Sequence, residues 1–186
     1  MVDEPFDIME QEVGKFSYYD KKGHFYYLLD GAIYDVNLMT MEQSAIASGL
    51  SSDKYAVSKN RRVVAYPNSD LKEETTQIII HDFATGEVTY EKGDENDRFA
   101  ALGFVGDDLI MGVANYEDVY IPSDGEAILP FYKVSIIDPI GNVLKEYEKT
   151  SIYIMDAIVQ ADKIYLERGI KRNNFFEDAE PDFISY

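Results

Sequence analysis

The chain has 186 residues, of which 46% are hydrophobic and 13% aromatic, a composition that supports a folded domain and argues against disorder. Lys and Arg total 17 against 35 Asp and Glu, so the formal net charge is −18. This charge argues against nucleic acid and anionic membrane surfaces as partners, because both attract clustered Lys and Arg. The chain has no cysteine, which excludes a disulfide scaffold, a thiolate metal site and a cysteine nucleophile.

The start of the chain carries no recognisable targeting signal. Met1 to Pro5 are acidic where a signal peptide has a basic region, and no apolar run approaches the length of a membrane span, so we expect no membrane insertion. The compartment stays open, and we favour an exported or cell-surface location over a cytoplasmic one.

Residues 1–14 are expected to form an N-terminal extension, either a short helix capped by Asp3 or a strand added to a neighbouring sheet. From Phe16 onward, short runs rich in Tyr, Phe and β-branched residues alternate with turn sequences, which predicts strands. The run 43–47 has two interpretations. The repeat favours a fourth strand, whereas a capping box from Thr40 to Gln43 would begin one or two helical turns.

The clearest repeat unit covers residues 77–90, in which two predicted strands flank a turn. Asp82 can accept hydrogen bonds from the backbone ahead of it, and Gly86 can adopt a positive φ. Asp35 and Asp138 occupy equivalent positions, which gives a repeat of about 40 to 50 residues with four short strands, the range of propeller blades. We therefore predict an all-β, propeller-like single domain with blades at about 15–49, 55–92 and 99–149 and an incomplete blade at 152–186.

Two segments of the second repeat carry a resemblance to a known family. They are Ser58-Lys59-Asn60-Arg61-Arg62 and Ile79-Ile80-His81-Asp82-Phe83-Ala84-Thr85-Gly86-Glu87. They resemble the blade motifs of WD40-like β-propellers, of the kind found in TolB and in prolyl oligopeptidase-type peptidases, although Asn60-Arg61 stands where the family has an Asp-Gly turn. Closed propellers have about four to eight blades. We therefore expect an incomplete or open propeller with exposed sheet edges that pair with another copy.

Long loops between the second and third strands of each blade are the expected binding face, because equivalent loops of stacked repeats project from one side. They cover residues 67–76, 115–130 and 171–181. The binding residues predicted there are Asp70, Tyr116, Glu117, Asp118, Tyr120, Phe175, Phe176, Glu177 and Asp178. Such an acidic, aromatic face suits a protein or glycan partner. No cofactor is expected, with Ca²⁺ as a minor alternative.

The sequence contains no nucleophile motif and no phosphate-binding glycine loop. His24 and His81 lie in predicted strands without a second metal ligand nearby in the sequence, so we interpret both as structural. The leading hypothesis is a non-catalytic propeller-type binding module. Two alternatives stay open: a fragment or accessory domain of a larger peptidase or glycoside hydrolase, whose chemistry needs only two carboxylates, and a structural module that self-associates by edge-strand pairing.

Overall fold

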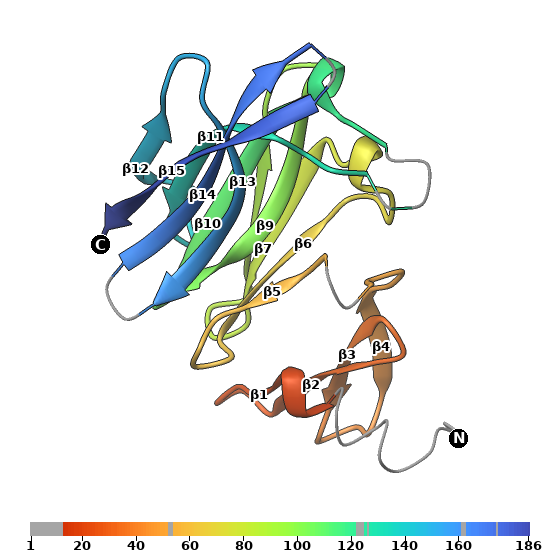
Figure 1. Ribbon diagram of the computed structural model, residues 1–186. Coiled ribbons are helices and arrows are strands. Elements are labelled where there is room, and N and C mark those ends of the chain that lie inside the picture. The colour runs from red at the N-terminus through yellow and green to blue at the C-terminus, as the bar shows by residue number, and fades with distance from the viewer. Residues whose placement is uncertain (1–12, 52–53, 122–124, 126, 161–162, 174) are drawn as a thin grey trace.

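The computed structural model is all-β and describes residues 13–51, 54–121, 125, 127–160, 163–173 and 175–186 (Figure 1). Within these ranges it has fifteen strands, all paired antiparallel, two short 3-10 helices and a helical stretch at residues 13–15. Residues 1–12 of the predicted N-terminal extension lie outside the described part. The predicted fold class is confirmed, because successive strands form antiparallel sheets laid out as propeller blades.

The first two blades are separate four-stranded sheets. The first has the order β1-β2-β3-β4, with bounds Ser17–Tyr19, His24–Leu29, Ala32–Asn37 and Gln43–Ala47. The second has the order β5-β6-β7-β8, with bounds Ala56–Val57, Val63–Pro67, Gln77–Asp82 and Glu87–Lys92. Residues 43–47 pair with β3, so the strand interpretation of this run is confirmed and the helical one is wrong.

The third and fourth blades share one sheet of seven strands. Their bounds are β9 Asp97–Val105, β10 Asp108–Asn115, β11 Phe131–Ile137, β12 Val143–Glu148, β13 Tyr153–Gln160, β14 Lys163–Arg172 and β15 Phe175–Ser185. The order is β15-β14-β13-β11-β10-β9, with β12 paired beside β11, and the pair Phe131–Ile154 joins the two blades. The fourth blade has three strands, so the propeller is partial.

The loop predicted over residues 171–181 is wrong. Strand β14 continues to Arg172 and β15 begins at Phe175, so the predicted site residues Phe175, Phe176, Glu177 and Asp178 lie in a strand. Only residues 173 and 174 separate the two strands, and Asn173 adopts a φ of 53°, a conformation that asparagine tolerates. Two turn residues between paired strands are a hairpin signal. The polar residues that favoured a loop are accommodated because an edge strand is open to solvent.

Three hydrophobic cores fill the spaces between successive blades. In β6, Val63 belongs to the core shared with the third blade, and its neighbour Val64 to the core shared with the first. In β10, Leu109 faces the second blade and Ile110 the fourth. Because successive side chains of a strand point to opposite faces, central strands buried on both sides become continuous apolar runs.

Of the three repeated aspartates, Asp82 and Asp138 organise turns, whereas Asp35 pairs with His24. Asp82 Oδ1 accepts hydrogen bonds from the N–H groups of Ala84 at 2.9 Å and Thr85 at 3.3 Å, and Gly86 has a φ of 80°. Arg62 Nε also donates to this carboxylate at 2.9 Å. Burial raises the pKa of Asp82, but the bonds from Arg62 and the backbone outweigh it, so the pKa lies below its ordinary value.

Alternation of strand direction places every turn between the second and third strands of a blade at the same face, here called the loop face. It carries the β6–β7 loop with η1 (Lys72–Glu74), the β10–β11 loop with η2 (Tyr116–Asp118), and the β14–β15 turn. Figure 1 shows η1 and η2 near one another at this end of the blades. The turns between third and fourth strands lie at the opposite face.

Candidate functional site

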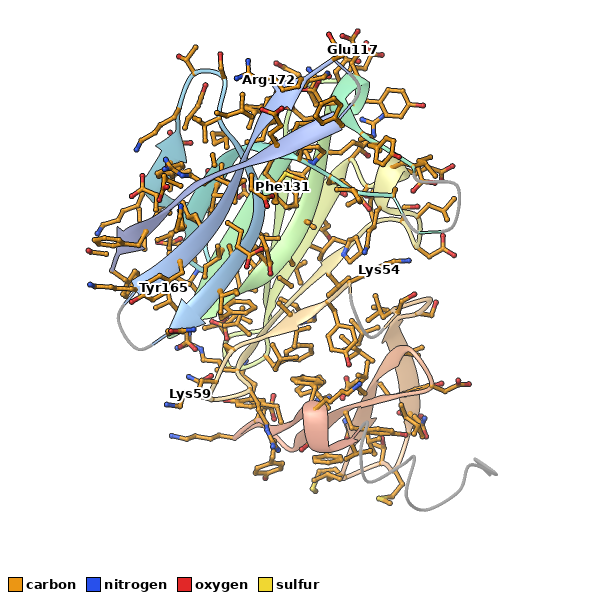
Figure 2. The ribbon with its side chains drawn as sticks, viewed as in Figure 1. Lys54, Lys59, Glu117, Phe131, Tyr165 and Arg172 are labelled. Atoms are coloured by element: carbon orange, nitrogen blue, oxygen red, sulfur yellow. The ribbon has the colours of Figure 1, made fainter. Side chains whose placement is uncertain are left out.

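One group of predicted site residues meets where η2 approaches the β14–β15 hairpin (Figure 2). Asp118 forms an ion pair with Lys171, and the Phe176 ring packs edge-on against Tyr153 with centroids 5.1 Å apart. Burial, together with the hydrogen bond to Asp118, raises the pKa of Tyr153. Glu177 lies 3.2 Å from Arg172 Nε. Both acids are paired with cations of the same chain. The Asp118–Lys171 pair fastens η2 to the fourth blade, whereas the Glu177–Arg172 pair lies within the β14–β15 hairpin.

The other predicted residues are spread along the loops and the hairpin. Tyr116 lies beside Arg98, whose guanidinium carbon is 4.5 Å from the ring centroid, and the Tyr120 backbone exchanges hydrogen bonds with Ile128. The side chains of Tyr116 and Tyr120 stay about half exposed, at 52% and 46%. The side chains of Asp70, Glu117 and Asp178 are exposed and form no ion pair with any described group. Phe175 is exposed as well.

No group of three or more His, Asp or Glu side chains suitable for a metal occurs in the described ranges. The acidic cluster at residues 93–97 is a turn, in which Asp97 accepts the N–H of Asp94 at 2.9 Å and the hydroxyl of Tyr132 at 3.0 Å. His24 Nδ1 lies 2.7 Å from Asp35 across two paired strands. Of the described helices, none is long and apolar enough to cross a membrane.

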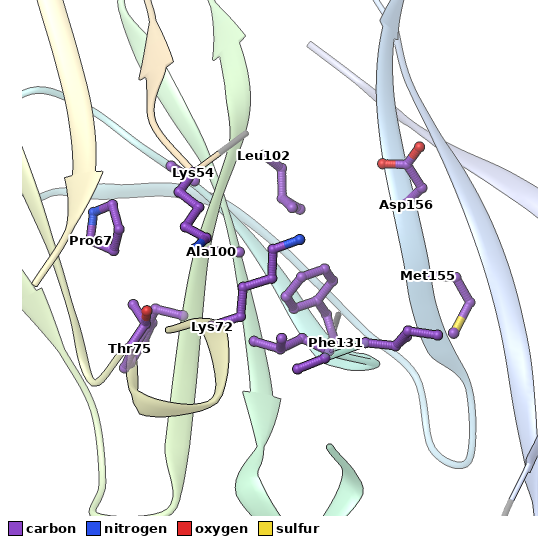
Figure 3. A pocket seen from close by; sticks show the side chains of 14 residues that line it. Lys54, Pro67, Lys72, Thr75, Ala100, Leu102, Phe131, Met155 and Asp156 are labelled. Carbon is purple, nitrogen blue, oxygen red and sulfur yellow. The ribbon is translucent and has the colours of Figure 1, made fainter. Parts of the chain in front are cut away.

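The loop face contains a cavity of about 360 Å³ that sequence reasoning did not predict (Figure 3). It lies between β9 and β13, the first strands of the third and fourth blades, and is closed by parts of the β6–β7 and β10–β11 loops. Its lining residues are Lys54, Pro67, Lys72, Thr75, Phe99, Ala100, Ala101, Leu102, Ala127, Ile128, Leu129, Phe131, Met155 and Asp156. Most of the lining is apolar, and two ammonium groups and one carboxylate belong to it.

The β6–β7 loop positions Lys72. Phe99 N–H donates to the Thr75 carbonyl at 3.0 Å, and Arg98 Nε donates to the Glu73 carbonyl at 2.6 Å, so η1 is held against β9. Lys54 reaches the same place from the segment before β5, and its Nζ donates to the Asp70 carbonyl. A second hollow of about 240 Å³ shares Lys54 and Lys72 with the cavity.

The apolar wall is rigid because its aromatic residues are buried. Phe99 and Phe131 are 4% and 5% exposed, respectively. The Phe131 ring lies so close to β10 that a Cβ at Gly112 would be 2.5 Å from it, and glycine is therefore required there. Asp156 enters from β13, with its Oδ1 accepting the N–H of Ala157 at 2.8 Å. Figure 3 shows Asp156 and the two lysines on opposite sides of the cavity.

Sequence reasoning identified two of the loops around this cavity but missed its charged residues. It selected acidic and aromatic loop residues, whereas the cavity uses Lys72, Lys54 and Asp156 together with buried strand residues. The one signal in the sequence that pointed to this cavity was the presence of lysines within or next to a long loop of a strongly acidic chain. Asp156 carries no such signal, because it lies within a strand.

No family model matches this chain, and no curated protein matches it. Solved structures do. The β-propeller domain of the Trilobed protease from Pyrococcus furiosus, described as having an open velcro topology, matches over 91% of this chain and 58% of that one, at 17% identity and a TM-score of 0.43. Acylaminoacyl peptidase from Pyrococcus horikoshii matches over 95% and 33%, at 14% identity and a TM-score of 0.41.

The WD40 repeats of RRP9 match over 79% of this chain and 42% of that one, at 11% identity and a TM-score of 0.42. The chain therefore spans between 33% and 58% of the length of these three solved chains. The assignment of blades rests on the strand order and the interblade cores described above.

Proposed function

We propose that this chain is a non-catalytic binding module of the WD40-like propeller type, and that its loop face binds a protein partner. The observation that carries the proposal is a set of large apolar side chains that stay exposed on this face. They are Leu71 at 45%, Tyr116 at 52%, Tyr120 at 46%, Ile121 at 60%, Ile128 at 40% and Phe175 at 55%. Ile128 lines the cavity, and Leu71 and Ile121 line the second hollow beside it. Exposed apolar side chains that gather on one face are typical of interaction sites.

The side chains on this face favour a polypeptide over a glycan. Leu71, Ile121 and Ile128 are aliphatic, and aliphatic groups have little affinity for a hydroxyl-covered sugar. The acids Asp70, Glu117 and Asp178 and the net charge of −18 favour a partner with basic residues, which the field of the chain attracts. The expected partner segment therefore combines apolar and basic residues.

The experiment uses a triple variant, Tyr116→Ala, Tyr120→Ala and Phe175→Ala. Phe176 is left in place because it packs against Tyr153. The chain is immobilised, exposed to an extract of the source cells and chemically cross-linked, and retained proteins are quantified by mass spectrometry. We expect the triple variant to lose the retained partner, since each aromatic residue that acts as an interface hot spot contributes about 2 kcal/mol or more.

A matched control removes three exposed apolar side chains from the opposite face. Met39, Met41 and Ile140 lie in turns between third and fourth strands and are 86%, 73% and 60% exposed. Their replacement by Ala should leave the partner bound. Retention of the same proteins by both triple variants would disprove the proposal.

Self-association through sheet edges stays a prediction. Strand β15 forms a long edge, but it carries Glu177, Asp178, Glu180 and Pro181. Charged residues and proline at an edge oppose pairing with another chain. The proposed function therefore does not include edge pairing.

A further inference from the structure

The cavity between β9 and β13 has a charge pattern that selects one kind of small molecule. We propose that it binds a small zwitterion in which an apolar body of about the size of one aromatic ring separates a carboxylate from an ammonium group. This goes beyond the proposed function, because a protein could bind the loop face with the cavity empty. The experiment on partner binding and the experiment on the cavity can therefore each disprove its own proposal without affecting the other.

The size and lining of the cavity suit a small organic ligand. Its volume of about 360 Å³ lies at the lower end of the range for ligand pockets, which are mostly apolar with a few placed polar groups. Phe99, Leu102, Leu129 and Phe131 provide apolar surface. Because the aromatic rings belong to buried core positions, the site is formed without side-chain rearrangement, which limits the entropic cost of binding.

The charged groups are divided between two sides. Lys54 and Lys72 extend their stems from one side, and Asp156 lies on the other (Figure 3). An ammonium group has three N–H donors, so Lys54 can donate to a ligand carboxylate while it keeps its hydrogen bond to the Asp70 carbonyl. Asp156 Oδ2 has no hydrogen-bond partner among the described residues and can accept from a ligand ammonium group.

The charge of the whole chain distinguishes a zwitterion from a simple anion. With a net charge of −18, the protein repels an anion approaching from solution, whereas a molecule without net charge is not repelled. A simple cation would be attracted by the chain but would meet two ammonium groups in the cavity. Only a molecule with both charges complements both sides.

The test uses three probes with the same aromatic body. They are 4-(aminomethyl)benzoate, which carries both charges, 4-methylbenzoate, which lacks the ammonium group, and 4-methylbenzylamine, which lacks the carboxylate. Affinities are measured by isothermal titration calorimetry at pH 7 and low salt. We expect the zwitterion to bind at least about tenfold more tightly than either analogue, since one charge-assisted hydrogen bond contributes about 1.5 kcal/mol.

Two variants assign the two ends. Lys72→Met should weaken the zwitterion about tenfold and leave 4-methylbenzylamine unchanged, and Asp156→Asn should weaken the zwitterion and leave 4-methylbenzoate unchanged. Lys92→Met and Asp94→Asn, at exposed positions that do not line the cavity, are the charge-matched controls and should bind as the wild type does. Circular dichroism checks the fold, and Lys72→Gln replaces Lys72→Met if the latter unfolds.

Equal affinity of the three probes for the wild-type chain would overturn the proposal, whatever the variants do. Tighter binding of 4-methylbenzoate than of the zwitterion would also overturn it, because the cavity would then be an anion site. Unchanged zwitterion binding by both cavity variants would place the ligand elsewhere.

Discussion

Asp182 joins the fourth blade to the third, and its replacement by Asn tests how much that connection stabilises the fold. Asp182 belongs to β15. Its Oδ2 accepts hydrogen bonds from Lys149 Nζ at 2.6 Å, Tyr147 Oη at 2.9 Å and Arg168 Nη1 at 3.2 Å. Oδ1 accepts the N–H of Phe183 at 2.9 Å. In Asp182→Asn an amide NH₂ replaces one of these oxygens and faces a donor.

The structure gives the size of the effect. The hydrogen bond from Lys149, followed by those from the Phe183 backbone and Tyr147, lowers the pKa of Asp182 from 3.8 to about 2. At about 1.4 kcal/mol per pH unit, this difference corresponds to about 2 kcal/mol, and solvent screening at this partly exposed position reduces it to about 1 kcal/mol. We therefore expect Asp182→Asn to lower the free energy of unfolding at pH 6 by about 1 kcal/mol.

The pH dependence separates this electrostatic effect from a packing defect. Because the folded pKa is lowered, the stabilisation is fully present above the ordinary pKa of 3.8 and is lost as the pH falls toward 2. Urea unfolding followed by tyrosine fluorescence at pH 6, 4 and 3 should show the difference between wild type and variant shrinking. A gap that stays constant with pH, or no gap at pH 6, would refute the reasoning.

Glu180→Gln is the control for this experiment. Glu180 lies in the same strand, and its side chain is exposed and forms no ion pair with any described residue. Its replacement changes the net charge of the chain by the same amount. We expect unfolding free energies within about 0.5 kcal/mol of the wild type at every pH.

Two further predictions concern the core between the first and second blades. Phe83 is 1% exposed and packs against the rings of Phe16 and Tyr26, with centroids 4.9 and 4.7 Å away, so Phe83→Ala should lower the unfolding free energy by about 3 to 5 kcal/mol in urea titrations. A loss below about 1 kcal/mol would show that these blades do not unfold together. His81 is buried, its Nδ1 has no hydrogen-bond partner among the described residues, and burial lowers its pKa although Asp82 opposes this. Wild type should therefore lose stability as the pH falls below about 6.5, whereas His81→Leu should lose less. Equal shifts in melting temperature between pH 7.5 and pH 5.5 for the two proteins would contradict the role of His81.

Local signals were sufficient for most of the fold. The aspartate turn at Asp82 and Gly86 works through bonds to residues a few positions ahead, so it can be recognised without knowledge of the rest of the chain. The prediction failed at the hairpin 172–175, because polar residues on an edge strand look like a loop when the edge itself is unknown. The pairing of Arg172 with Phe175 becomes evident only when β14 is in place.

The sequence by itself determined the all-β class, the repeat, the partial propeller and the face on which the long loops 67–76 and 115–130 lie, since turn chemistry and the alternation of side chains act over a few residues. Only the tertiary structure decided which side chains come together on that face. Lys54, Lys72, Phe131 and Asp156 are separated by long stretches of chain, and they line one cavity because β9 and β13 lie side by side when the third and fourth blades share a sheet and a core. Such proximity depends on interblade packing, which no local pattern records.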